Sequence, residues 1–337
     1  RDPEMSRGLG DVYKRQDHMD GVGNRYGVHT VILEVDGEEV FRSVVDRFAY
    51  EENRYINSWT HGQYMKSFIE PGNRLRMLHA SNGNRGLVEI NEERPYRFVY
   101  TLSDALGNTS KVRFTVQGKN TEIHPVEHRE KYAFKWDRTN YLQEPGLELV
   151  VPRGMLYDDV WLDYSVRADS GDVAFTYQLH NKRVPLHGAC EMRIGLRRDR
   201  LEDKSKYYVA GVTARGGKYS IGGTYEDGFM KVRIRDLGTY TVAVDTVPPE
   251  IIPLNPGQWG RTGRITLKAK DKETGINSYR GTIDGKYALF GKPNSISGNL
   301  VCELDPKHVK KGGRHTVEMT VTDGRGNRTT EEFHFVW

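Results

Sequence analysis

The sequence has little cysteine and no long hydrophobic run. Its two cysteines, Cys190 and Cys302, lie far apart in regions that we assign to different domains. A disulfide framework needs a larger, regularly spaced set, so the sequence excludes one, and we expect both cysteines to be small buried residues. No apolar stretch approaches the roughly 20 residues that a membrane-spanning helix needs, which excludes a chain that crosses a bilayer as a helix.

The sequence also lacks a dominant charge of one sign. Lysine and arginine number 50, aspartate and glutamate 46, and the formal net charge is +4. The densest basic stretch runs from Arg193 to Arg200 and is followed at once by Glu202 and Asp203. Because nucleic-acid-binding proteins usually concentrate their basic residues on one surface, this mixed pattern predicts no nucleic-acid partner.

Catalytic and metal-binding motifs are missing as well. The sequence contains no G-x-S-x-G, no phosphate-binding G-x-x-x-x-G-K-[ST], no H-E-x-x-H and no H-x-H. His124 and His128 are four residues apart, but Pro125 lies between them and predicts a connector rather than a helix that presents two ligands. We therefore expect no catalytic residue, no metal ligand and no cofactor in this chain, and we predict that it is not an enzyme.

Paired carboxylates are the one feature that could suggest glycoside hydrolysis. Asp158, Asp159 and Asp163 lie near Trp161 in the sequence. Carboxylate pairs are common by chance in a chain with this many acids, so we favour that interpretation over a sugar-cleaving site.

Glycine-rich turns between aromatic and β-branched runs are abundant, and they predict strands. Asp36-Gly37 interrupts two alternating runs and is a strong hairpin signal, because glycine accepts a positive φ. The pattern T-x-[ST]-D-x-x-G-N occurs twice, at 101–108 and 320–327. In each copy the aspartate can accept backbone N–H groups of the turn and Gly-Asn tolerates the left-handed region. We expect few helical segments: a turn or short helix from Tyr50 to Trp59, and one turn from Asp305 to Lys310.

These patterns predict an all-β chain of tandem antiparallel β-sandwich domains. The repeated D-x-x-G-N hairpin resembles the last hairpin of bacterial immunoglobulin-like domains. We divide the chain into an immunoglobulin-like β-sandwich at 17–118, a β-sandwich at 119–246, and a second immunoglobulin-like β-sandwich at 247–337. Pro248 and Pro249 follow the second boundary and indicate a short stiff linker. Residues 1–16 resemble a translated sequencing adaptor, and we interpret them as a non-native tail.

One cluster of aromatic residues is a candidate interaction surface. It consists of Tyr50, Arg54, Tyr55, Trp59 and Tyr64. Core packing or docking against a neighbouring domain is the favoured interpretation, because aromatic side chains supply much of the buried area in small sandwiches. A platform that stacks on sugar rings is the alternative.

Several segments resemble the region that follows the catalytic domain in Bacteroidetes M23 (LytM-type) metallopeptidases. The resemblance rests on segments at 17–21, 26–28, 31–57, 71–73, 84–86 and 104–108, and on DKETGINSYRGTIDGKYAL from 271 to 289. It implies a secreted parent enzyme that cuts peptidoglycan cross-links with one zinc ion. The zinc ligands of that family come from H-x-x-x-D and H-x-H motifs, and neither occurs here, so no catalytic residue can be assigned.

Two hypotheses about function follow. The first is a non-catalytic accessory array in the periplasm or cell envelope, which positions or regulates an upstream M23 catalytic domain in cis. The alternative is a module that binds a glycan or peptidoglycan, or acts like an adhesin, on its own. An independent enzyme is the least favoured possibility.

Overall fold

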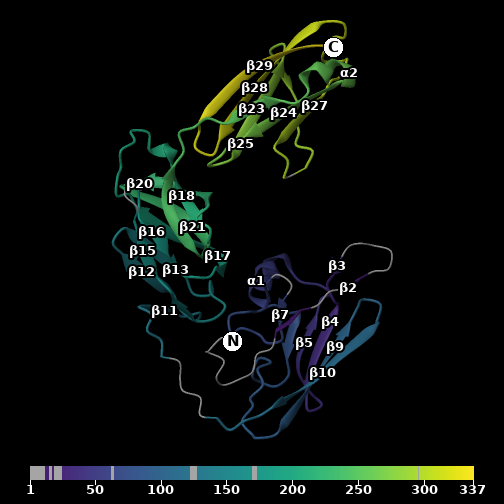
Figure 1. Cartoon of the computed structure of the whole chain (residues 1–337), viewed down its shortest axis with the longest axis vertical. Helices are drawn as coiled ribbons and strands as arrows, with labels where there is room; N and C mark the ends of the chain where they lie inside the picture. Colours follow the sequence, from purple (N-terminus) through teal and green to yellow (C-terminus); the bar gives the residue numbers. More distant parts are fainter. Residues whose placement is uncertain are drawn as a thin grey trace.

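Three β-domains follow one another along the chain (Figure 1). The computed structural model describes residues 12–14, 17–18, 25–61, 64–121, 127–168, 173–294 and 296–337. Each domain has its own hydrophobic core, formed by side chains within 28–116, 132–244 and 251–337. The predicted all-β fold class is confirmed, since the two α-helices of the described residues span four residues each.

The first domain is built on a five-stranded antiparallel sheet of order β10-β9-β4-β5-β8. Its strands are β4 (Thr30–Val35), β5 (Glu38–Val44), β8 (Leu78–Ala80), β9 (Pro95–Ser103) and β10 (Thr109–Gln117). Alternate residues of β4 and β9 face inward, as the period of two predicts. Residues from outside the sheet, among them Trp59, Leu75 and Val88, complete the core.

Short elements flank this sheet. A 3₁₀ helix, η2 (Tyr50–Tyr55), continues into α1 (Ile56–Trp59), which confirms the predicted helical segment. The remaining strands are β1 (Val12–Lys14), β2 (Asp17–His18), β3 (Arg25–Tyr26), β6 (Thr60–His61) and β7 (Tyr64–Lys66). Strand β1, which lies within the predicted non-native tail, pairs with β7. The rest of that tail lies outside the described residues.

The middle domain contains two five-stranded sheets whose buried side chains form one core. The first sheet has strands β12 (Asn140–Glu144), β13 (Leu147–Val151), β17 (Val184–Gly195), β20 (Thr224–Glu226) and β21 (Phe229–Leu237). The second has β15 (Ser165–Arg167), β16 (Thr176–Gln178), β18 (Tyr207–Val212), β19 (Lys218–Gly222) and β22 (Thr239–Val244). The shorter elements are β11 (Tyr132–Phe134), β14 (Val160–Leu162) and η3 (Lys204–Lys206).

The last domain packs a three-stranded sheet against a four-stranded sheet. The first consists of β23 (Glu250–Pro253), β24 (Arg264–Lys270) and β27 (Asn299–Glu303). The second consists of β25 (Ile276–Ile283), β26 (Lys286–Ala288), β28 (Arg314–Asp323) and β29 (Arg328–Val336). Two short helices, η4 (Pro256–Gln258) and α2 (Trp259–Thr262), bring the buried Trp259 ring into the core.

The first and last domains share a sheet order and both of its hairpin turns. The order β10-β9-β4-β5 corresponds to β29-β28-β25-β26. Asp36-Gly37 and Asp284-Gly285 form the first turn of each, with positive φ at both residues. In the second turn Asp104 and Asp323 each accept N–H groups from the residues two and four positions ahead. The turn chemistry predicted from the repeated motif is therefore confirmed.

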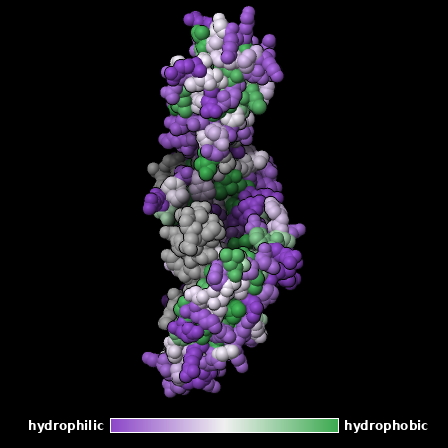
Figure 2. Space-filling model, turned by 90° about the vertical axis from the view of Figure 1, so that its right-hand side faces the viewer, coloured by the Kyte–Doolittle hydropathy of each residue, from purple (hydrophilic) through white to green (hydrophobic). Residues whose placement is uncertain are grey.

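The surface is largely hydrophilic on the face that Figure 2 shows, with apolar residues in separate small groups. Cys190 and Cys302 are both buried and free, as expected. Among the described residues, no helix is long and apolar enough to cross a membrane.

A buried histidine closes the last domain beside the Asp284 turn. His315 lies within hydrogen-bond distance of Asp284 through Nδ1 (2.7 Å) and of the Lys310 carbonyl through Nε2 (2.8 Å). The contact with His315, followed by the bond from the Thr316 N–H, holds the pKa of Asp284 below its usual value.

The lowered pKa of Asp284 predicts an acid-sensitive last domain. A carboxylate whose pKa is lower in the folded than in the unfolded chain stabilises the fold above the unfolded pKa, near about 4. That stabilisation is lost as the pH falls through the folded pKa. We expect Asp284→Asn to reduce the loss of stability between pH 7 and pH 3, measured by pulsed hydrogen exchange of β28 peptides across a urea series. The exposed Glu332→Gln is the control, and an unchanged pH dependence in Asp284→Asn would contradict the assignment.

Candidate functional sites at the domain junctions and in the middle domain

The predicted interaction surface divides into three parts in the structure. Tyr50 (91% exposed) and Tyr64 (48% exposed) lie on the surface. Trp59 lies in the core of the first domain (3% exposed) and donates its ring N–H to the Lys66 carbonyl. It is therefore not an open ring on which a sugar could stack. Arg54 and Tyr55 contact the middle domain.

These contacts form a first junction, between the first and middle domains, where η2 contacts β17; Figure 1 labels α1, which continues η2, near β17. The Tyr157 hydroxyl donates to the Arg54 carbonyl (2.6 Å), and Arg54 Nη2 donates to the Leu186 carbonyl (3.3 Å). The Tyr55 ring lies 4.2 Å from the ring of His187. Burial raises the pKa of Tyr157 and lowers that of His187, which keeps both side chains neutral at neutral pH. Docking between domains, the favoured interpretation of the cluster, thus holds for Arg54 and Tyr55.

The backbones of the two domains also touch directly at Gly72. Its N–H donates to the Tyr157 carbonyl (2.7 Å). A Cβ at this position would lie 2.6 Å from the Leu156 carbonyl oxygen and 2.8 Å from Tyr157 Cα. Only glycine permits this approach.

A cleft of about 400 Å³ lies beside this junction, and Asp158, Asp159 and Trp161 contribute to its lining. The Trp161 ring is covered, because the His128 ring stacks on it at 3.8 Å and Lys135 Nζ lies 4.5 Å from its centroid. Asp159 forms an ion pair with Lys135 (2.8 Å). Burial in the cleft raises the pKa of Asp158, and the charges of Glu70 and Asp159 add to that effect.

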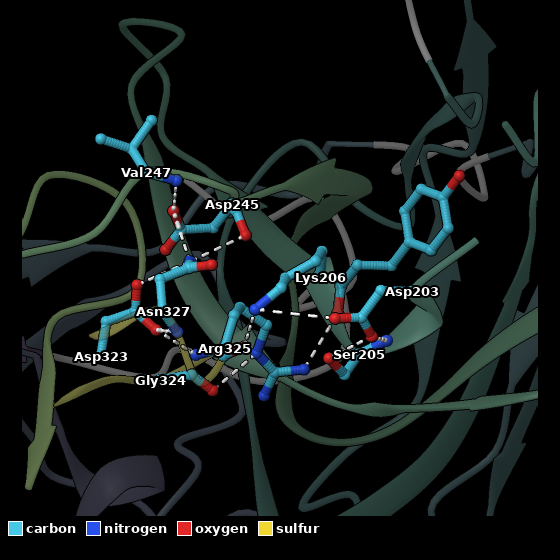
Figure 3. Close-up of polar contacts among 10 residues, drawn as sticks. Asp203, Ser205, Lys206, Asp245, Val247, Asp323, Gly324, Arg325 and Asn327 are labelled. Atoms are coloured by element: carbon cyan, nitrogen blue, oxygen red, sulfur yellow. Dashed lines mark hydrogen bonds and ion pairs between the residues drawn. The ribbon is translucent and has the colours of Figure 1, made fainter. Parts of the chain in front are cut away.

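The second junction joins the middle and last domains through the repeated hairpin (Figure 3). Arg325, at the tip of this hairpin, donates through Nη1 to the carbonyls of Tyr207 (2.9 Å) and Gly223 (3.0 Å). In return, Lys206 Nζ donates to the Arg325 carbonyl (3.0 Å). The guanidinium therefore satisfies main-chain carbonyls of the middle domain rather than pairing with a carboxylate.

Three carboxylates meet at the same junction and could hold a cation. Asp245, Asp271 and Asp323 each present an oxygen within 4.8 Å of the others, and Asp245 and Asp323 are almost fully buried. Oxygen ligands of this kind suit a hard cation such as Ca²⁺. The same carboxylates also accept bonds from the chain: Thr274 Oγ1 donates to Asp245 (2.5 Å), and Asn327 Nδ2 donates to Asp323 (2.7 Å) and to the Asp245 carbonyl (3.0 Å).

Sequence reasoning missed this cluster because it considered histidine spacing. Asp245 lies at the end of the middle domain and Asp271 and Asp323 lie far apart in the last domain, so only the folded chain brings the three together. The local signals were present: Asp323 belongs to the repeated hairpin and Asp245 precedes the two linker prolines.

The sequence did not predict a third site, which we call the middle-domain hollow. It encloses about 570 Å³ beside the second sheet of the middle domain. Residues of β15, β16, β19 and β22 line it together with the segment from His180 to Arg183. Because its lining residues come from strands and loops between 165 and 239, no local sequence motif predicts it.

One wall of the hollow is the ring of Tyr219, which lies across Gly211 on the neighbouring strand. The two residues are direct partners in the β18–β19 register. A Cβ at Gly211 would lie 2.3 Å from Tyr219 Cζ, so the ring rests against the bare backbone there. An aromatic ring commonly covers a cross-strand glycine in this way. Tyr219 remains 39% exposed, which leaves part of the ring open.

A buried polar group, Asp236, also lines the hollow. Asp236 is 8% exposed and forms an ion pair with Arg183 (2.7 Å). The Tyr240 hydroxyl also donates to Asp236 Oδ1 (2.8 Å). These partners hold Arg183 in a defined position at the rim, since a bound guanidinium loses much of its rotamer freedom.

Comparisons with known proteins give one family and several distant structures. A family model described as a Zu5-like domain matches residues 131–245, which is the middle domain and less than half of the chain. No curated protein matches the sequence. Solved structures with similarity include a Ca²⁺-stabilized adhesin with which an Antarctic bacterium binds ice (10% identity, 99% of this chain and 94% of that chain covered, TM-score 0.18). Another is SGBP-B of the Bacteroides ovatus mixed-linkage glucan utilization locus, in complex with a heptasaccharide (11% identity, 91% and 60% covered, TM-score 0.16). TM-scores this low carry no inference about function.

The two copies of the repeated hairpin offer a matched test of the second junction. Asn327 is buried and bonds both to its own turn and to Asp245, whereas Asn108 makes the same turn bond in solvent. We expect Asn327→Ala to lower the free energy of unfolding by about 1–3 kcal/mol, because it leaves buried acceptors without donors. Asn108→Ala should cost less than about 1 kcal/mol. Denaturant unfolding measures both, and equal effects would argue against a role for Asn327 in joining the domains.

Gly72→Ala tests the first junction. A Cβ there meets main-chain atoms, which cannot rotate away, so we expect a loss of about 1–3 kcal/mol. Faster hydrogen exchange at 156–157 should accompany it. Gly257→Ala, where a Cβ meets nothing within 4 Å, is the control. Stability and exchange that match the control would show that the domains do not approach each other at Gly72.

Proposed function

We propose that this chain is a glycan-binding module in which the middle-domain hollow receives a sugar, while the first and last domains hold it in a set orientation. The observation that carries the proposal is the hollow itself. Its volume of about 570 Å³ falls within the range of small-ligand sites. It also joins a partly open tyrosine ring to side chains that donate and accept hydrogen bonds.

The chemistry of the lining suits a polyhydroxylated ring. Gln178, Thr176 and Thr239 line the hollow and supply amide and hydroxyl groups, which both donate and accept. The Gln178 side chain donates one amide N–H to the Asp163 carbonyl (3.0 Å). This bond holds the Gln178 side chain in place. The open part of Tyr219 offers an apolar face beside these polar groups. Sugars present the same combination of C–H faces and hydroxyl edges.

The two junctions support a positioning role for the neighbouring domains. Hydrogen bonds from Arg54, Tyr157 and Gly72 hold the first domain, and those of Arg325 and Asn327 hold the last. Both sets end on the middle domain or on the linker that leaves it. Domains tied in this way keep the hollow at a constant angle to the rest of the protein. We place the module in the cell envelope or outside the cell, as the sequence resemblance implies.

The accessory role beside an M23 catalytic domain is a second candidate, and one observation favours it. The hairpin Asp104–Asn108 has the turn bonds of the docking hairpin Asp323–Asn327. It is exposed, and Leu106 at its tip is 89% exposed. A preceding domain could dock there as the middle domain does on the equivalent tip. Binding in trans to an M23 catalytic domain, lost in Leu106→Asp, would support this role, and absence of binding would contradict it.

Glycan binding is tested with oligosaccharide arrays followed by calorimetry on the best ligands. We expect Tyr219→Ala to weaken binding about tenfold or more, which corresponds to roughly 1.4 kcal/mol. Gly211→Ala should weaken it as well, because the new methyl group displaces the ring. Tyr287→Ala removes an exposed tyrosine of the last domain and should change nothing. Failure of every saccharide to bind, or full binding by Tyr219→Ala, would overturn the proposal.

A further inference from the structure

The charges that line the hollow are unequal in number. Arg167, Lys182 and Arg183 contribute three cationic groups, and Asp236 contributes one carboxylate. Asp236 is already paired with Arg183 and bonded by Tyr240. Its charge therefore offsets Arg183 and leaves that of Arg167 and Lys182.

No carboxylate pairs with these two residues in the part of the chain that the structure describes. Neither Arg167 nor Lys182 takes part in a described ion pair, and both are exposed. Exposed lysines and arginines are common on protein surfaces. What distinguishes this pair is that both line one hollow together with Arg183, so their positive charges are concentrated around a single concave site.

His180 contributes a neutral group to the hollow rather than a further charge. It lines the hollow, and its Nδ1 accepts the Asp163 N–H (3.1 Å). Burial lowers its pKa, and the charge of Lys182 lowers it further, against the opposing effects of Asp163 and Glu130. The imidazole is therefore neutral at neutral pH and does not add to the positive charge, but its Nε2–H is left as a donor.

Arg183 adds directional donors at the rim. Its guanidinium carries five N–H groups in a planar fork, and the ion pair with Asp236 is made through Nη2. The side chain is 72% exposed. The remaining N–H groups are free to donate to a second anionic group, and a carboxylate or sulfate matches that geometry.

We propose that the hollow takes an anionic sugar, with a carboxylate or sulfate group bound among Arg167, Lys182 and Arg183. The inference rests on the proposed glycan site and names the class of sugar. Tyr219 contributes the stacking surface, and the cationic groups select for charge. A neutral sugar would leave Arg167 and Lys182 with no ion pair to any residue that the structure describes.

The experiment compares hexagalacturonate with its methyl ester, which has the same rings without charge. A carrageenan hexasaccharide, with sulfates and no carboxylates, identifies the source of the anion. We expect the whole chain to bind one of the two anionic hexamers on the order of tenfold more tightly than the ester. Arg167→Ala/Lys182→Ala should remove that preference.

Lys111→Ala/Arg113→Ala removes two exposed cations from β10 of the first domain and serves as the matched control. Its preference should equal that of the unmodified chain. If the ester binds as tightly as both anionic hexamers and Tyr219→Ala weakens them alike, the charge inference fails and glycan binding stands. If no hexamer binds, the charge inference fails, and the oligosaccharide array decides separately whether glycan binding stands. A preference that is lost only in the β10 variant would place the anion elsewhere and would also overturn the inference.

Discussion

The arrangement of the last two domains depends on a carboxylate that accepts backbone N–H groups. Asp323 closes its hairpin with the same bonds that Asp104 makes in solvent, but it does so while nearly fully buried beside Asp245. Neighbouring buried carboxylates repel each other and lose hydration, so each needs donors. The turn supplies Asp323 with two N–H groups and the Asn327 amide, and Asn327 also reaches the Asp245 carbonyl. A local turn motif has thus become a link between domains.

Main-chain carbonyls are the recurring acceptors at both junctions. Arg325 donates to Tyr207 and Gly223, and the Tyr157 hydroxyl and Gly72 N–H likewise bond to backbone oxygens across the first junction. A bond of this kind depends on the path of the partner chain and little on its side chains. Domain orientation is therefore set mostly by where turns end. Buried carbonyls that found no donor would cost more than these bonds contribute.

The use of main-chain carbonyls as acceptors also explains which features the sequence could predict and which it could not. Hairpins such as Asp36-Gly37 follow from residues adjacent in sequence, and their φ angles agree with the prediction. Core packing or docking could be expected from the aromatic cluster, but the sequence does not show that Trp59 joins the first core while Tyr55 contacts the middle domain. The hollow and the aspartate cluster join side chains from distant strands, and their bonds often end on carbonyls, which every sequence contains. No spacing rule describes such sites.

His180 lines both the cleft beside the first junction and the middle-domain hollow. A comparison of the cations at these two sites shows why the hollow is the better candidate for a charged ligand. At the cleft beside the first junction, the lining residue Lys66 pairs with Glu70, and Lys135, which lies over the Trp161 ring, pairs with Asp159. A paired cation contributes little binding free energy, because the ion pair that must be broken offsets the new contact with the ligand. In the hollow, the carboxylate of Asp236 is held by Arg183 and Tyr240, and nothing among the described residues neutralises the remaining cations. Folding thus pairs these two lysines of the cleft internally, whereas Arg167 and Lys182 of the hollow have no ion pair among the described residues and can accept a partner that carries the opposite sign.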